Sequence, residues 1–140
     1  MKKMEIDKRK QGKKNRQSGA RFELKVRKDL ESKGWIVAKW MNNVDLEENK
    51  FIQAKHKFCG FGRPMAIGTG FPDFIVFSPV DSVRPKIAGV ESKSNGYLDK
   101  TEKQKCKWLL ENQIFSKILI AKKGEKRGQI EYVEFKEKEI

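Results

Sequence analysis

The sequence predicts an α/β fold, a mixed β-sheet flanked by helices in the order α-β-β-β-α-β-β. Three observations support this. Helical periodicity marks about 19–32, short β-branched runs follow it, and a second helical pattern separates the last two of these runs from the others. At 140 residues the chain is expected to form one domain, which we place at 18–140.

The chain begins with a strongly basic segment. Residues 1–17 hold eight Lys and Arg and only two acidic residues, with almost nothing to bury, so we expect a disordered arm. Such an arm either lies along a phosphate backbone or is a solvated tail without a partner. Ser18 then suits the N-cap of a helix over about 19–32. Its buried stripe recurs every four residues, at Phe22, Val26 and Leu30.

The strands are read from short apolar runs bounded by turn residues. Residues 35–40 form the first strand, and 41–70 lack a clear period, as in a long loop or insertion that could contain a short hairpin. The remaining expected elements are strands over 71–77 and 86–92, a helix from Asp99 or Thr101 to about Asn112, and strands over 117–121 and 129–135.

The charge balance restricts the class of partner. A formal net charge of +13 favours a polyanion, with nucleic acid ahead of an anionic membrane surface. The alternative is a lysine- and glutamate-rich surface that serves solubility or a hot habitat. No apolar run approaches the roughly 20 residues of a membrane span, so we expect no membrane association.

The cysteines do not predict a metal or disulfide framework. Cys59 and Cys106 lie far apart, and the one histidine, His56, makes only a His-x-x-Cys with Cys59. This pattern falls short of a structural zinc site and is typical of free thiols. Together with the absence of a signal-like apolar segment, it predicts an intracellular, cytoplasmic protein associated with the nucleoid.

Two expected strand ends carry the chemistry. Asp73 opens one apolar run, and Glu91 and Lys93 close the next on a shared face, while Ser92 should point to the other face. If the two strands pair as a hairpin, Asp73 and Glu91 become neighbours that suit Mg²⁺, with Mn²⁺ as a substitute. Lys93 could then orient or help deprotonate a metal-bound water. The alternative is a surface aspartate and an exposed Glu-x-Lys pair.

Two helical residues are further candidates. Glu23 borders the apolar stripe of the first helix, where a metal or lysine partner would explain it; the alternative is a pair with Arg27. Gln104 lies four residues before Trp108 on the second helix, so both face the same way. Gln104 could therefore reach Lys93, a ligand or a phosphate, or it is merely a surface amide.

Together these residues resemble the PD-(D/E)XK nuclease superfamily, with a restriction-endonuclease-like fold. Pro72-Asp73 matches the PD element and Glu91-Ser92-Lys93 the (D/E)XK element. From about 18 to 121 the chain is most similar to archaeal Holliday junction resolvases and small VRR-NUC nucleases. The resemblance implies that Asp73 and Glu91 bind metal with the Ser92 carbonyl and Glu23. It also implies that Lys93 aids the attacking water and that Gln104 supports the site.

The sequence therefore predicts a Mg²⁺-dependent DNA endonuclease that acts on branched DNA, resembling a Holliday junction resolvase, as a homodimer. The alternatives are a restriction or repair nuclease on duplex or flap DNA, and a non-catalytic DNA-binding module. The residues expected to contact DNA are Arg21, Lys55, Lys57, Arg63 and Lys100.

Overall fold

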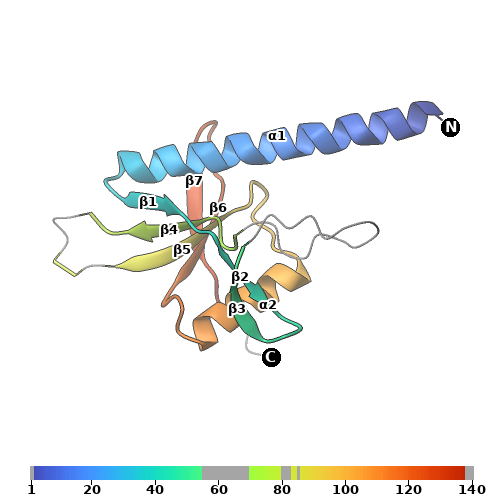
Figure 1. The fold of residues 1–140 in the computed structure, drawn as a ribbon. Helices are drawn as coiled ribbons and strands as arrows, with labels where there is room; N and C mark the ends of the chain where they lie inside the picture. Colours follow the sequence, from blue (N-terminus) through green and yellow to red (C-terminus); the bar gives the residue numbers. More distant parts are fainter. Residues whose placement is uncertain (1, 55–69, 80–82, 85, 138–140) are drawn as a thin grey trace.

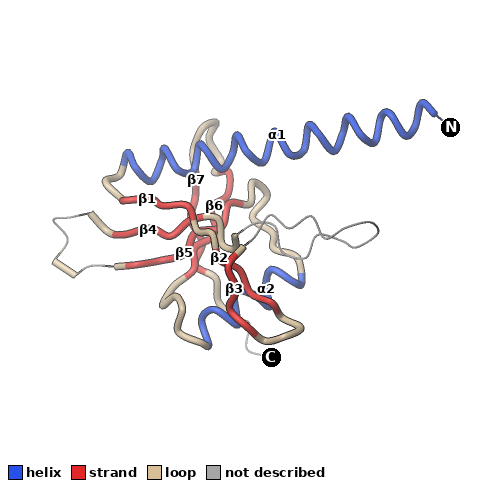
Figure 2. The backbone as a smooth tube through the Cα atoms, viewed as in Figure 1, coloured by secondary structure: helices blue, strands red, loops and turns tan. Residues whose placement is uncertain are grey.

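The computed structural model describes residues 2–54, 70–79, 83–84 and 86–137, and it has an α/β fold (Figures 1 and 2). For residues 2–9 only the backbone is described. In chain order the elements are α1 (Lys2–Ser32), β1 (Ile36–Lys39), β2 (Asn42–Asp45), β3 (Lys50–Gln53), β4 (Phe74–Phe77), β5 (Ile87–Ser92), α2 (Lys100–Glu111), β6 (Ile118–Lys123) and β7 (Ile130–Glu134).

The main sheet is mixed, as the sequence predicts. Five strands lie in the order β1-β4-β5-β6-β7, and every neighbouring pair is antiparallel except the parallel pair β5 and β6. The predicted hairpin of the second and third strands is confirmed as β4 and β5, with Phe74 opposite Val90. The short hairpin that 41–70 could contain is present, because β2 and β3 form a separate antiparallel pair.

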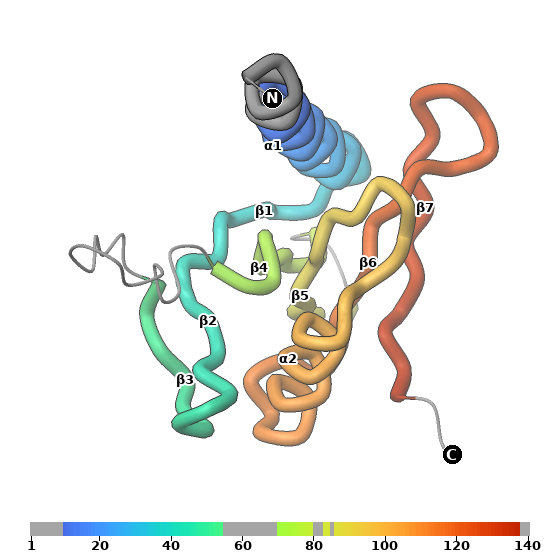
Figure 3. Tube along the Cα trace, turned by 90° about the vertical axis from the view of Figure 1, so that its right-hand side faces the viewer, coloured from blue at the N-terminus to red at the C-terminus, as the bar shows by residue number. Residues whose placement is uncertain are grey.

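The two helices lie on opposite faces of the main sheet (Figures 1 and 3). The predicted stripe of α1 is buried and packs on Phe74, Val76, Ala88 and Val90. Cys106 and Leu109 of α2 pack with Ile118 and Ile120 against the other face, together with Val44 of β2. Alternation along β5 therefore turns Val90 toward α1 and Glu91 toward α2.

The start of α1 differs from the prediction. The helix described begins at Lys2, so residues 2–17 are helical and not a disordered arm, and Ser18 lies within the helix instead of capping it. The segment contains no proline and is rich in lysine, arginine and glutamine, which have high helix propensity. Its N-terminal part projects beyond the sheet (Figure 1), and nearly all side chains of 10–20 are exposed.

The predicted start of the second helix is confirmed. Asp99 is the N-cap of α2, and its side chain accepts a hydrogen bond from the Glu102 backbone. The Glu102 carboxylate accepts one in return from the Asp99 backbone, which completes a capping box. The C-cap is Asn112.

One strand is shorter than predicted. The run expected over 71–77 becomes extended only at Phe74, and Phe71 and Pro72 are buried in a bend before it. Asp73 therefore lies just ahead of β4, where the regular alternation of strand side chains does not apply. This difference decides how Asp73 meets β5.

Among the described residues, no helix is both long and apolar enough to cross a membrane. Cys106 is a free, buried thiol, and burial raises its pKa to about 12. The proposed thiol Cys59 and the lone His56 lie outside the described residues.

Candidate active site

Asp73 is held against the end of β5 by two hydrogen bonds. Its Oδ2 atom accepts one from the Ser92 backbone at 2.8 Å and one from the Ser92 hydroxyl at 2.6 Å. Gly89 allows this approach, because a Cβ atom at that position would lie 2.8 Å from Cγ of Pro72. The Pro72-Asp73 pair therefore packs directly on the strand that carries Glu91.

Glu91 is the most deeply buried carboxyl group of the site, with 5% of its surface exposed. Desolvation, a hydrogen bond to Asp73 and the Asp73 charge raise its pKa to about 11, against a smaller opposing effect of Lys93. At neutral pH and without a cation, Glu91 is therefore protonated and donates a hydrogen bond to Asp73. The predicted proximity of these two carboxyl groups is confirmed.

Glu23 of α1 faces the same region from the opposite layer. Partial burial and then the Asp73 charge raise its pKa, while the charge of Lys39 lowers it. The alternative of a Glu23–Arg27 ion pair is wrong, since Arg27 pairs with Glu31 at 3.1 Å. Glu23 is thus an electrostatic neighbour of Asp73, as expected from its place at the edge of the apolar stripe.

Lys93 forms an ion pair with Glu102. Its Nζ lies 2.6 Å from Glu102 Oε2. Burial alone would lower the pKa of Lys93, but the hydrogen bond and charge of Glu102, with the charges of Glu91 and Asp99, raise it. Lys93 is therefore a fixed cation at neutral pH. Glu102 connects this cation to the first turn of α2.

The Ser92 hydroxyl reaches Asp73 although Ser92 was expected on the face of its strand away from Glu91, because Asp73 precedes β4 and lies at the strand end. For Gln104, the alternative of a surface amide is supported, since its side chain is exposed on α2. The position next to Lys93 is taken by Glu102, two residues earlier on the helix.

The residues expected to contact DNA are only partly described. Arg21 and Lys100 are exposed, on α1 and at the start of α2. Lys55, Lys57 and Arg63 lie outside the described residues.

Sequence reasoning missed two charged residues of the site. Glu102 was not expected at the site, although the Asp-x-x-Glu spacing from Asp99 indicates a capping box that places its carboxylate at the start of the helix. Lys39 ends β1 opposite Phe74, the residue after Asp73, and its charge acts on Glu23. A lysine that ends a strand is the available signal, but the pairing of β1 with β4 is needed to interpret it.

The donor set fits a divalent cation of the Mg²⁺ type. No three His, Cys, Asp or Glu side chains within the described ranges are arranged as they stand to hold a metal ion. Mg²⁺ usually keeps several waters and takes only one or two protein carboxylates, with substrate phosphate completing the shell. Asp73 and Glu91 supply such a pair, and a cation bound between them would offset the desolvation and the Asp73 charge that raise the pKa of Glu91.

Comparisons with known protein families, curated proteins and solved structures gave no match.

Proposed function

We propose that this chain is a Mg²⁺-dependent DNA endonuclease, resembling the PD-(D/E)XK superfamily and acting as a homodimer on branched DNA. One observation carries the proposal: Asp73 and the buried Glu91 are in hydrogen-bond contact at the strand ends, with Lys93 alongside. A buried carboxyl pair is costly in a core that has no use for it. It is well suited to a cation that activates water and neutralises a phosphodiester.

The residues have separate roles in this proposal. Asp73 and Glu91 would hold Mg²⁺, or Mn²⁺ in its place, with the Ser92 carbonyl and Glu23 nearby. Ser92 fixes the orientation of Asp73 through its backbone and hydroxyl groups. The raised pKa of Lys93 favours a cation that stabilises negative charge on the phosphate over a base that removes a proton.

A second candidate from another class is a non-catalytic DNA-binding module. The lack of a ready three-ligand metal group among the described residues and the close Lys93–Glu102 pair favour it. Such a module would bind DNA equally well in EDTA and would tolerate replacement of Glu91. A restriction or repair nuclease on duplex or flap DNA would share the catalytic residues and differ only in substrate.

The test is cleavage of a four-way junction, a flap and a plain duplex, each with Mg²⁺ and with EDTA. We expect the wild-type protein to cut the junction with Mg²⁺ and Asp73→Asn to lose at least about 100-fold in rate. Asp45→Asn is the matched control, because Asp45 lies on β2 outside the site. Equal rates for Asp73→Asn and wild type on all three substrates would overturn the proposal.

A further inference from the structure

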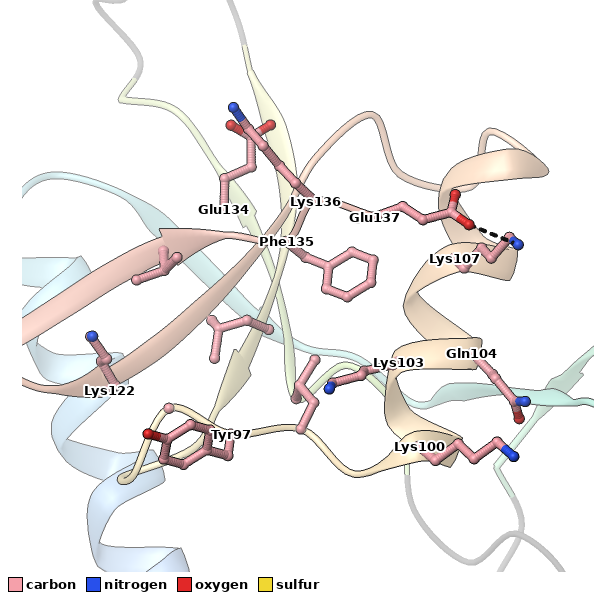
Figure 4. A pocket seen from close by; sticks show the side chains of 14 residues that line it. Tyr97, Lys100, Lys103, Gln104, Lys107, Lys122, Glu134, Phe135, Lys136 and Glu137 are labelled. Atoms are coloured by element: carbon pink, nitrogen blue, oxygen red, sulfur yellow. Dashed lines mark ion pairs between the residues drawn. The ribbon is translucent and has the colours of Figure 1, made fainter. Parts of the chain in front are cut away.

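A pocket of about 590 Å³ opens beside the candidate active site, on the α2 side of the sheet (Figure 4). It lies between α2 and strands β6 and β7, and its volume falls within the roughly 300–1,000 Å³ of small-ligand sites. Apolar side chains contribute much of its wall, among them Ile120, Val133 and Phe135. Tyr97 adds a second aromatic ring and is 78% exposed.

Lysines surround this apolar wall. Figure 4 shows Lys103 reaching toward the pocket from α2, with Tyr97 and Phe135 across from the helix. The five lysines that line the pocket are Lys100, Lys103, Lys107, Lys122 and Lys136. Lys107 pairs with Glu137 at 2.8 Å, and Lys122 lies 3.9 Å from Glu131. Within the described part of the chain, the other three make no ion pair.

The pocket is joined to the candidate site by a short stretch of chain. Lys93 of the site is followed at once by the loop that carries Tyr97, and its partner Glu102 immediately precedes Lys103 on α2. Gly96 holds this loop close to β6, since its φ is +80° and a Cβ there would lie 2.9 Å from Lys122 Cδ. The candidate site and the pocket therefore share the 94–99 loop and the first turn of α2.

We propose that this pocket binds an unpaired, single-stranded segment of DNA next to the site of Asp73 and Glu91. The exposed ring of Tyr97 and the half-buried ring of Phe135, with lysines around them, fit bases that stack and phosphates that pair with cations. A duplex keeps its bases inside and would leave Tyr97 unused. In a two-fold dimer with this face at its interface, the lysines that line the pocket would meet the same lysines of the second copy. The inference rests on the proposed function and adds to its branched substrate an unpaired strand beside the branch point.

The test compares binding of a fluorescent single-stranded oligonucleotide and a duplex of equal length by anisotropy, in EDTA so that neither is cut. We expect Tyr97→Ala and Lys103→Glu to weaken single-strand binding about tenfold and duplex binding less than twofold. Tyr97→Phe keeps the stacking ring and should bind as wild type does. Lys86→Glu is the charge-matched control, because Lys86 is exposed just before β5, at the opposite end of that strand from Glu91.

Three outcomes would overturn the inference: an unchanged affinity of Tyr97→Ala for the single strand, equal losses on both DNAs, or an equal loss for Tyr97→Phe. Sedimentation of the same variants measures their oligomeric state and so tests the alternative that a second copy of the chain occupies the pocket. If Tyr97→Ala converts a dimer into a monomer, the pocket is a contact between copies and the inference is wrong. Because binding is measured without metal, a failure here is distinct from a failure of Mg²⁺-dependent cleavage.

Discussion

At the scale of single residues, the pair Asp73 and Glu91 has an unusual electrostatic requirement. Glu91 is buried and in hydrogen-bond contact with Asp73, so the pair needs either a proton or a cation between its two carboxyl groups. Ser92 fixes the position of Asp73 by donating hydrogen bonds from its backbone N–H and its hydroxyl group. The geometry therefore favours a proton or a cation bound between Asp73 and Glu91 over two charged carboxylates with nothing between them.

This requirement predicts a pH-dependent stability. The pKa of Glu91 is near 4.5 in the unfolded chain and about 11 in the fold, so the folded state binds the extra proton between these values. Stability in EDTA should fall as pH rises from about 5 to 9, by at most about 1.4 kcal/mol per pH unit from this group. Glu91→Gln should flatten that slope in urea unfolding curves. A slope that persists unchanged in Glu91→Gln would contradict this assignment.

Among the elements, α2 has the most direct link between local structure and the site. Its capping box ties Asp99 to Glu102, and Glu102 in turn holds Lys93. The start of the helix and the position of the cation are therefore set by one carboxylate. A substitution at the N-cap residue Asp99 should therefore alter the position of Lys93.

The capping box gives a second prediction. Asp99→Ala removes the side chain that accepts from the Glu102 backbone, and should lower the free energy of unfolding by about 1 kcal/mol. If the cap also positions Glu102, the cleavage rate should fall while DNA affinity stays the same. Glu111→Ala, at the other end of α2, is the control and should change neither quantity. No loss of stability in Asp99→Ala would show that the cap is dispensable.

Local sequence patterns predicted which helices and strands form better than they predicted where each one begins and ends. The α1 stripe and the alternating strands depend on residues that bury side chains, and these are confirmed. The helical start at Lys2 could not be read from burial, because residues 10–20 are exposed and only propensity favours the helix. The β2–β3 hairpin was expected only as a possibility without a position, because polar Asn42 and Asn43 lie in it, and Asn43 is buried.

The part of the site that depends only on the pairing of two strands was predicted from the sequence. The antiparallel register of β4 and β5 does this for Asp73 and Glu91. Side-chain contacts were less predictable: the contact between Ser92 and Asp73 was missed because Asp73 was expected within a strand, whereas it precedes β4. For Gln104, the helical spacing to Trp108 left a contact with the site and a surface position both open, because it does not fix how far around α2 the side chain lies.

On the scale of the whole molecule, positive charge is spread over projecting elements. The N-terminal part of α1 extends past the sheet (Figure 1), and four of its described cations are exposed: Lys10, Lys13, Lys14 and Arg16. No acidic residue occurs between 8 and 22. A second basic group surrounds the β6–β7 turn near α1: Lys25, Lys123, Lys126 and Arg127. Both groups suit contacts with phosphates.

The N-terminal part of α1 that projects past the sheet, the α1 extension, gives a third prediction. Replacing Lys10, Lys13, Lys14 and Arg16 by Gln should weaken DNA binding and reduce the salt slope by about 0.9 for each duplex phosphate that these cations neutralise. The unfolding midpoint should stay the same, because these side chains are exposed. Binding measured at several salt concentrations checks the slope. An unchanged slope would mean that the extension is a solvated helix without a nucleic-acid partner.

If Asp73 and Glu91 share one divalent cation, a Mn²⁺ titration followed by electron paramagnetic resonance should detect it. We expect a saturable Mn²⁺ site in the wild-type protein that Asp73→Asn and Glu91→Gln each abolish and Asp45→Asn retains. Displacement of Mn²⁺ by excess Mg²⁺ should follow from the oxygen-only donor set. Mn²⁺ binding that survives in both Asp73→Asn and Glu91→Gln, or no saturable binding in the wild type with or without DNA, would contradict a shared cation.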